Sequence, residues 1–146
     1  MNPNKTLMID ELKRVVEAKD EQGLIKLLDF KISSRFDPNC YEYLEKILMG
    51  TWHIQHEDLL NTIYLENHID DRFVDPILNI ALNRELYRRH DDEMEATLRK
   101  CVHALMTIHT AKSMSALEKL KDLNNENVKI ALEMYKLSCL DFYFNT

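Results

Sequence analysis

The residues best suited to chemistry are two histidines and a carboxylate, His53, His56 and Glu57, in the run TWHIQHEDLL that begins at Thr51. Two imidazoles and a carboxylate could bind a metal ion. Helical zinc motifs, however, place their histidines four residues apart on one face, whereas these are three apart and straddle an expected helix start. One alternative is structural: Trp52 packs under the next helix, and His56 or Asp58 caps it. The other is an exposed recognition surface, where tryptophan is a typical interface anchor. We therefore expect no metal here.

Other arrangements typical of enzymes are weak. His103 and His109 are six residues apart on one expected helix and do not share a face, and Cys101 lies on an apolar stripe, as a buried thiol does. Two glycines in the whole chain could hardly build a phosphate-binding loop. The acidic pairs Asp70-Asp71 and Asp91-Asp92 are typical of a solvated face. The sequence therefore predicts neither an enzyme nor a cofactor.

The cysteines and the N-terminus bear on the compartment. Cys40, Cys101 and Cys139 are odd in number and widely spaced, without a CxxC pair, which argues against disulfides and zinc ribbons. The first ten residues lack the apolar core of a secretory signal, and no stretch approaches the roughly 20 apolar residues that span a bilayer. We expect a cytoplasmic protein with reduced thiols.

The charge is concentrated in the middle of the chain. The net charge is −6, and residues 56–95 hold eleven acidic and four basic residues, so this segment carries −7 and the rest +1. Such a centre would repel nucleic acid and anionic membranes and attract a basic protein. A solvated acidic face that only keeps the protein in solution remains the alternative.

Length, composition and periodicity all favour helices. The 146 residues fit one domain, and 45 % hydrophobic residues can build a core without disulfides or metal. Two glycines and three prolines are few for a protein of hairpins. Apolar residues recur at helical spacing almost throughout. The expected helices carry Met8–Val16, Leu24–Leu28, Leu44–Leu48, Leu59–Ile63, Phe73–Ala81, Leu98–Ile108, Met114–Leu123 and Val128–Tyr135.

Local signals mark several of the helix ends. Asp20 and Asn125 are expected to cap the helices that follow them, and Asp37-Pro38 combines a cap with a first-turn proline. Gly50 fits a helix stop, and Pro76 is expected in a first turn. The polar residues 83–92 form the longest expected loop. Short connections predict antiparallel neighbours.

An internal repeat is suggested by comparing residues 60–83 with 100–123. At an offset of 40 residues, Leu65 falls on Leu105, Val74 on Met114, Ile77 on Leu117 and Ile80 on Leu120. A helix-pair period of this length is in the range of HEAT and armadillo repeats.

Two segments carry a resemblance to a known group. ALMTIHTAKSMSALEKL, from Ala104 to Leu120, resembles the turn and second helix of a HEAT-type repeat, with Met106 and His109 where that family commonly has glycine. TWHIQHEDLL, with its WHxxHED core, resembles a segment of small bacterial HEAT-like proteins that are often immunity partners of secreted antibacterial toxins. The resemblance covers about residues 40–138 and implies binding and neutralising a cognate toxin without catalysis.

The combined prediction is an all-α protein, a HEAT-like α–α solenoid of seven to eight antiparallel helices. Its expected parts are N-terminal helices in 1–35, HEAT-like pairs in 38–138 and a tail in 139–146. The expected function is that of an immunity protein, monomeric before binding, whose acidic surface covers a basic toxin such as a nuclease. A general scaffold or adaptor of the same fold is the alternative. The predicted partner-binding residues are Trp52, Glu66, Asp70, Asp71, Asp75, Asp91 and Asp92.

Overall fold

The structure is a computed structural model that describes residues 3–30, 36–87 and 94–143, and these residues form helices and turns without a strand. The predicted all-α class is therefore confirmed for this part of the chain. The α-helices are α1 (Pro3–Ala18), α2 (Glu21–Phe30), α3 (Tyr41–Met49), α4 (His56–Leu65), α5 (Val74–Leu82), α6 (Arg84–Tyr87), α7 (Met94–Ile108), α8 (Ala111–Lys121) and α9 (Glu126–Tyr143). The short 3-10 helices η2 (Pro38–Cys40) and η3 (Asp71–Phe73) lead into α3 and α5.

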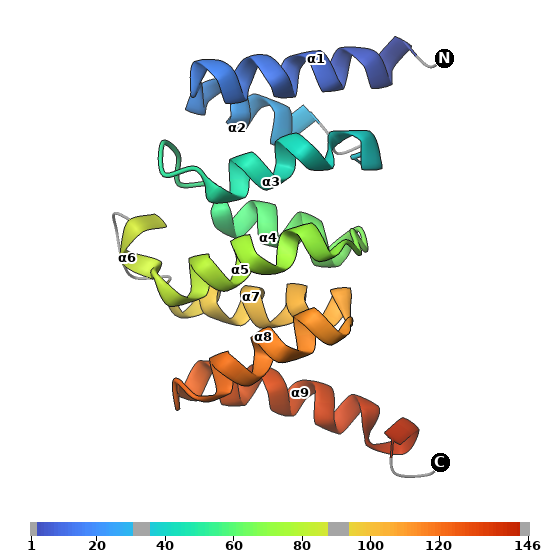
Figure 1. Cartoon of the computed structure of the whole chain (residues 1–146), viewed down its shortest axis with the longest axis vertical. Coiled ribbons are helices and arrows are strands. Elements are labelled where there is room, and N and C mark those ends of the chain that lie inside the picture. The colour runs from blue at the N-terminus through green and yellow to red at the C-terminus, as the bar shows by residue number, and fades with distance from the viewer. Residues whose placement is uncertain (1–2, 31–35, 88–93, 144–146) are drawn as a thin grey trace.

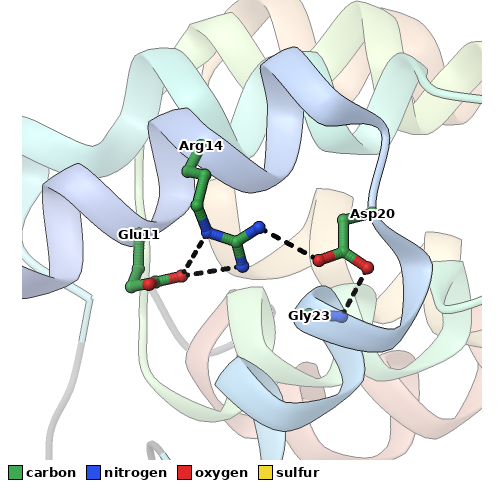
Figure 2. A network of polar contacts seen from close by, with 4 residues as sticks. All are labelled: Glu11, Arg14, Asp20 and Gly23. Carbon is green, nitrogen blue, oxygen red and sulfur yellow. Dashed lines mark hydrogen bonds and ion pairs between the residues drawn. The ribbon is translucent and has the colours of Figure 1, made fainter.

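The corner between α1 and α2 is built by one capping carboxylate. Asp20 Oδ1 accepts a hydrogen bond of 3.0 Å from the Gly23 amide, and this confirms the predicted cap. The Arg14 guanidinium lies between Glu11 and Asp20 and forms ion pairs of 3.0 and 3.1 Å with them (Figure 2). The Gly23 amide and Arg14 lower the pKa of Asp20. A Cβ on Gly23 would lie 2.5 Å from Asp20 Oδ2, so this packing favours glycine there.

The other predicted helix starts and ends are also observed, but the reason for glycine at position 50 differs from the expected one. Asp37 accepts a hydrogen bond of 2.9 Å from the Asn39 amide and starts η2, with Pro38 in its first turn. Pro76 is the third residue of α5, and Asn125 Oδ1 accepts from the Asn127 amide at the start of α9. Gly50 ends α3, but its φ is −72°, so its role is not left-handed freedom. A Cβ there would lie 2.5 Å from Trp52 Nε1, which explains the glycine.

Two boundary predictions differ from the structure. Residues 83–92 were expected to be a loop, but Arg84–Tyr87 form the short helix α6, and residues 88–93 lie outside the described residues. Helix α6 begins after Asn83, whose side-chain amide donates to the Asn79 carbonyl and closes α5. Helix α9 runs to Tyr143, so most of the expected tail at 139–146 continues this helix.

Four helix ends use left-handed residues that are not glycine. Lys19, Asn67, His109 and Asn124 have φ between 50° and 57°, and each follows α1, α4, α7 or α8 by one to three residues. Such residues reverse the chain at a helix end, a place where glycine is usual. His109 therefore has a backbone conformation that glycine adopts readily. The low glycine count and the short turns are compatible for this reason.

The helices succeed one another along the long axis, from α1 at one end to α9 at the other (Figure 1). Helix α1 contacts α3, α3 contacts α5, and α5 contacts α8, so these four helices form one row. A second row consists of α4, α7 and α9, in which α7 contacts both of its neighbours. Contacts of α5 and α8 with α7 join the two rows. Most of the helices present one face to a continuous apolar core between the rows.

The core tests the proposed repeat. Ile77, Leu117, Ile80 and Leu120 are all buried, so the offset of 40 residues relates equivalent core positions of α5 and α8. The other two pairs fail, because Leu105 and Val74 are buried whereas Leu65 is 69 % exposed and Met114 is also exposed. The repeat is therefore limited to the second helix of each pair. No helix among the described residues has the length and hydrophobicity that crossing a bilayer requires.

Candidate functional site

Connections between helices lie at two opposite edges of the molecule, and both contain candidate residues. The turns α4–α5 and α7–α8 lie at one edge, on the right of Figure 1, and residues 50–55 and α6 lie at the other. Helix α5, nine residues and therefore about 13 Å long, separates the two edges.

The turn from α4 into α5 is fixed by backbone geometry and one carboxylate. Asn67 is left-handed, with φ 57°, and the His68 amide donates back to the Ile63 carbonyl at 2.9 Å, as in a Schellman motif. Asp70 then caps η3 by accepting from the Arg72 amide at 2.9 Å. The Arg72 side chain also pairs with Asp70 at 3.3 Å. Because Asp70 has this capping role, its side chain holds the turn and also contributes charge.

A buried histidine connects this turn to the core. His68 is buried, its Nδ1 lies 2.8 Å from the Tyr41 hydroxyl and its Nε2 lies 3.1 Å from Glu66 Oε1. Both distances fit one arrangement, in which the Tyr41 hydroxyl donates to Nδ1 and the Nε2 proton is donated to Glu66. Tyr41 packs edge-on against Phe73 with ring centroids 4.9 Å apart. Glu66 is therefore partly committed to an internal hydrogen bond.

Two contacts join the turn to α8 and its cap. The Thr110 hydroxyl donates to Asp71 Oδ1, and Thr110 also forms a reciprocal capping box with Ser113 at the start of α8. Lys112 Nζ lies 3.1 Å from Asp75 Oδ2, in an ion pair where Asp75 remains 74 % exposed. These links hold the α4–α5 and α7–α8 turns side by side. The carboxylates of Asp71 and Asp75 face solvent with only part of their hydrogen-bonding capacity used.

Two large aliphatic side chains are exposed among these carboxylates. Leu65 is 69 % exposed and Ile69 is 56 % exposed. We call this surface the acidic edge; it consists of Leu65, Glu66, Ile69, Asp70, Asp71 and Asp75. Single exposed aliphatic residues are common, but a pair surrounded by carboxylates combines apolar contact area with a charged rim. That combination is typical of surfaces that bind proteins, with a preference for basic partners.

The opposite edge contains the two histidines that suggested a metal, and there they are structural. We call it the histidine corner; it consists of Gly50, Trp52, His53, His56 and Tyr87. His53 Nε2 donates to the Ile47 carbonyl at 2.7 Å, and its Nδ1 accepts from the Gln55 amide at 3.0 Å. His56 Nε2 donates to the Gly50 carbonyl at 2.8 Å. The two rings stack with centroids 4.2 Å apart.

This arrangement does not suit a metal. Both Nε2 atoms carry protons that are donated to carbonyls, and the Glu57 carboxylate forms an ion pair with Lys100. No group of three potential ligands was found among the residues that the structure describes. His53 instead adds a second hydrogen bond to the Ile47 carbonyl, which also accepts from the Gly50 amide, and His56 bonds to the Gly50 carbonyl just beyond α3. The predicted capping of α4 by His56 or Asp58 is wrong, because the start of α4 has no side-chain cap hydrogen bond and His56 bonds to the Gly50 carbonyl at the end of α3.

Burial keeps both imidazoles neutral. Burial and, to a smaller extent, the neighbouring His53 lower the pKa of His56, the hydrogen bond to the Gly50 carbonyl raises it, and the net value is about 3. Burial also lowers the pKa of His53, while the bond to Ile47 and the charge of Glu21 raise it. His56 Nδ1 is buried and has no hydrogen-bond partner among the residues that the structure describes. Protonation at this corner would therefore place a charge in the core.

The predicted partner-binding residues divide between the two edges. Glu66, Asp70, Asp71 and Asp75 lie together on the acidic edge. Trp52 is half-buried at the histidine corner, edge-on to His53 with ring centroids 4.7 Å apart. Asp91 and Asp92 lie outside the described residues. Residues 83–87 follow the far end of α5 and therefore lie at the edge opposite Asp70 and Asp71.

Sequence reasoning missed the apolar half of the acidic edge. It aligned Leu65 with the buried Leu105 and left Ile69 unassigned. A signal was available, because Leu65 is one residue off the stripe of Leu59, Leu60 and Ile63 that faces the core. Thr110 contacts Asp71, 39 positions away, and Lys112 contacts Asp75, 37 positions away. No local sequence pattern predicts contacts over such separations.

Among the remaining candidates for chemistry, Cys40 and Cys101 are buried, His103 is half-buried and His109 is exposed. Cys40 and Cys101 are buried free thiols, and burial raises the pKa of Cys40. Burial lowers the pKa of His103, and the centroid of its ring lies 5.5 Å from that of the Tyr64 ring. Thiols with a raised pKa are poor nucleophiles.

Comparisons of the chain with family models, curated proteins and solved structures gave no match. We therefore infer function from the side chains themselves.

Proposed function

We propose that this protein is a binding protein without catalytic activity, whose acidic edge binds a basic protein partner. The observation that carries the proposal is the placement of two exposed aliphatic residues, Leu65 and Ile69, among Glu66, Asp70, Asp71 and Asp75. Burial of the aliphatic pair would supply affinity, and the carboxylates would select a basic surface.

The specific form of the proposal is an immunity protein that neutralises a cognate antibacterial toxin, such as a basic nuclease. A nuclease cleft attracts the phosphates of its substrate, and a carboxylate surface can occupy the same cleft by mimicry. The resemblance of the Thr51–Leu60 and Ala104–Leu120 segments to small bacterial HEAT-like immunity proteins supports this form. The proposal includes a cytoplasmic location and a monomer before binding.

The fold assignment that accompanies the proposal is a HEAT-like α–α solenoid. Two features support it: the two rows of helices, and the equivalence of Ile77 and Ile80 with Leu117 and Leu120. In such solenoids the binding residues are carried by one edge or face of the stack. An acidic edge made of two successive turns fits this pattern.

Capture followed by a protection assay tests the proposal. The tagged protein is used at low salt to capture partners from its source cells, and their intact masses are measured. We expect one stoichiometric basic polypeptide that is released at high salt, because charge pairs on an exposed edge are screened. Expression of that polypeptide alone should arrest growth, and co-expression with this protein should restore it. Capture of many unrelated proteins, or growth arrest that co-expression does not relieve, would favour a general scaffold instead.

A further inference from the structure

A groove between α2 and α4 adjoins the acidic edge. Its volume is about 340 Å³, which is within the range of pockets that hold small groups. Four residues of α4 line one wall, Asp58, Asn61, Thr62 and Leu65, and their spacing places them on one helical face. Leu28 and Asp29 of α2 form the opposite wall. Glu66 lies at the end of the groove, so the groove and the acidic edge share Leu65 and Glu66.

The carboxylates of this groove differ from most of those nearby. Asp70 pairs with Arg72, Asp75 with Lys112, and Glu57 with Lys100. Asp29 and Asp58, in contrast, form no ion pair or side-chain hydrogen bond with any residue that the structure describes. Two carboxylates therefore line an open groove to which the described chain supplies no cation of its own.

The walls are also suited to a particular shape of cation. Leu65 and Leu28 provide aliphatic surface, and the Asn61 side chain adds an amide oxygen. Long basic side chains have an aliphatic stem and a charged head, and they pack their stems on apolar surface while the head stays polar. A guanidinium has five donors that can be shared between two carboxylates, whereas an ammonium acts as a point charge.

We propose that the α2–α4 groove is a receptor site for an arginine side chain of the basic partner, with its stem on Leu65 and Leu28 and its guanidinium between Asp29 and Asp58. This inference rests on the proposed function for the basic nature of the partner. It adds a specificity site to the acidic edge, because the groove would select a long basic side chain over a surface that is only positively charged. The partner thus contributes at least one arginine next to the residues that cover Leu65 and Ile69.

A short peptide tests the groove without the partner. The probe is the tetrapeptide acetyl-Leu-Arg-Arg-Leu-amide, added to the full chain labelled with ¹⁵N, and amide and Asn61 side-chain shifts are followed by NMR. We expect the shift changes to map to residues 28–29 and 58–66. The same peptide with citrulline in place of arginine keeps the shape and loses the charge, and it should bind about tenfold more weakly.

Two matched double variants complete the test. Asp29→Asn with Asp58→Asn should weaken binding of the arginine peptide about tenfold, whereas Asp71→Asn with Asp75→Asn, an equal change of charge, should leave it within about twofold. Equal binding of the citrulline peptide, equal effects of the two double variants, absence of binding, or shifts confined to residues 67–75 would each overturn the groove site. None of these results bears on capture of the partner, so failure of the groove and failure of the proposed function remain distinguishable.

Discussion

The two edges of this molecule use the same residue types for different purposes. At the histidine corner, His53 and His56 are buried, neutral and bonded to backbone carbonyls, and the nearby Glu57 is neutralised by Lys100. At the acidic edge, His68 is buried too, but it supports a turn in which the carboxylates of Asp71 and Asp75 face solvent. The difference shows that histidine near carboxylates is not itself a sign of chemistry. The exposure of the carboxylate and the satisfaction of the imidazole decide between a structural and a binding role.

The largest effect on stability is expected at the histidine corner. His53→Ala removes two hydrogen bonds, leaves the Ile47 carbonyl with one partner fewer and opens space beside Trp52. We expect a loss of about 3 kcal/mol in the free energy of unfolding. Urea denaturation followed by tryptophan fluorescence measures it, since Trp52 is the only tryptophan. A loss below about 1 kcal/mol would show that this corner is not the structural region that we describe.

Acid should destabilise the protein through the same corner. The pKa of His56 is about 3 in the folded protein and 6.5 in its ordinary state, so the unfolded chain binds the proton more strongly. The contribution of neutral His56 to the free energy of unfolding is therefore fully present above about pH 6.5 and is lost as the pH falls toward 3. At pH 5 the loss from this residue is about 2 kcal/mol. His56→Gln keeps a donor for the Gly50 carbonyl and should remove this part of the pH dependence. Parallel pH profiles for the two proteins, measured by urea denaturation, would contradict the assignment.

A single methyl group at Gly50 should disturb the corner to a smaller extent. Gly50→Ala places a Cβ where the Trp52 indole now lies, so the ring must shift. We expect a loss of about 1–2 kcal/mol and a change in the tryptophan emission maximum. Glu42→Ala, at an exposed position of the same α3 helix, should leave the emission maximum unchanged and serves as the control.

The smallest effect on stability is expected at the acidic edge. Asp75→Ala removes an ion pair with Lys112 in which both side chains are about half exposed or more. Such pairs contribute little, so the free energy of unfolding should stay within about 0.5 kcal/mol of the unmodified protein. Thermal or urea denaturation measures it. A loss of about 2 kcal/mol would mean that the acidic edge supports the fold and would weaken its interpretation as a binding surface.

The parts of the molecule that local chemistry determines were predictable from the sequence. The stripe Leu44, Ile47 and Leu48 gave α3, and the caps Asp20, Asp37 and Asn125 marked three helix starts. The helix α6 was missed because Arg84–Tyr87 is a single turn in a polar stretch, too short to show a period. The left-handed residues Lys19 and His109 carry no special sequence mark, since lysine and histidine rarely adopt φ near 50°.

The candidate site was predictable only in part. The four acids from Glu66 to Asp75 come from one turn, and local sequence brings them together. The placement of Trp52 at the other edge depends on the direction of α4 and α5, which charge and periodicity do not report. Asp29 and Asp58 are 29 residues apart in the sequence, and they line one groove only because α2 lies beside α4.

The most direct test of the acidic edge compares two double charge reversals in binding to the captured partner. Asp71→Lys with Asp75→Lys spares the Asp70 cap, and Glu118→Lys with Asp122→Lys makes the same change in charge near the far end of α8. We predict that the first pair slows association and weakens binding at least about 100-fold at low salt, while the second changes binding less than about fivefold. Equal losses for the two pairs would mean that net charge alone attracts the partner, and an unchanged affinity for the first pair would contradict the acidic edge as its binding surface.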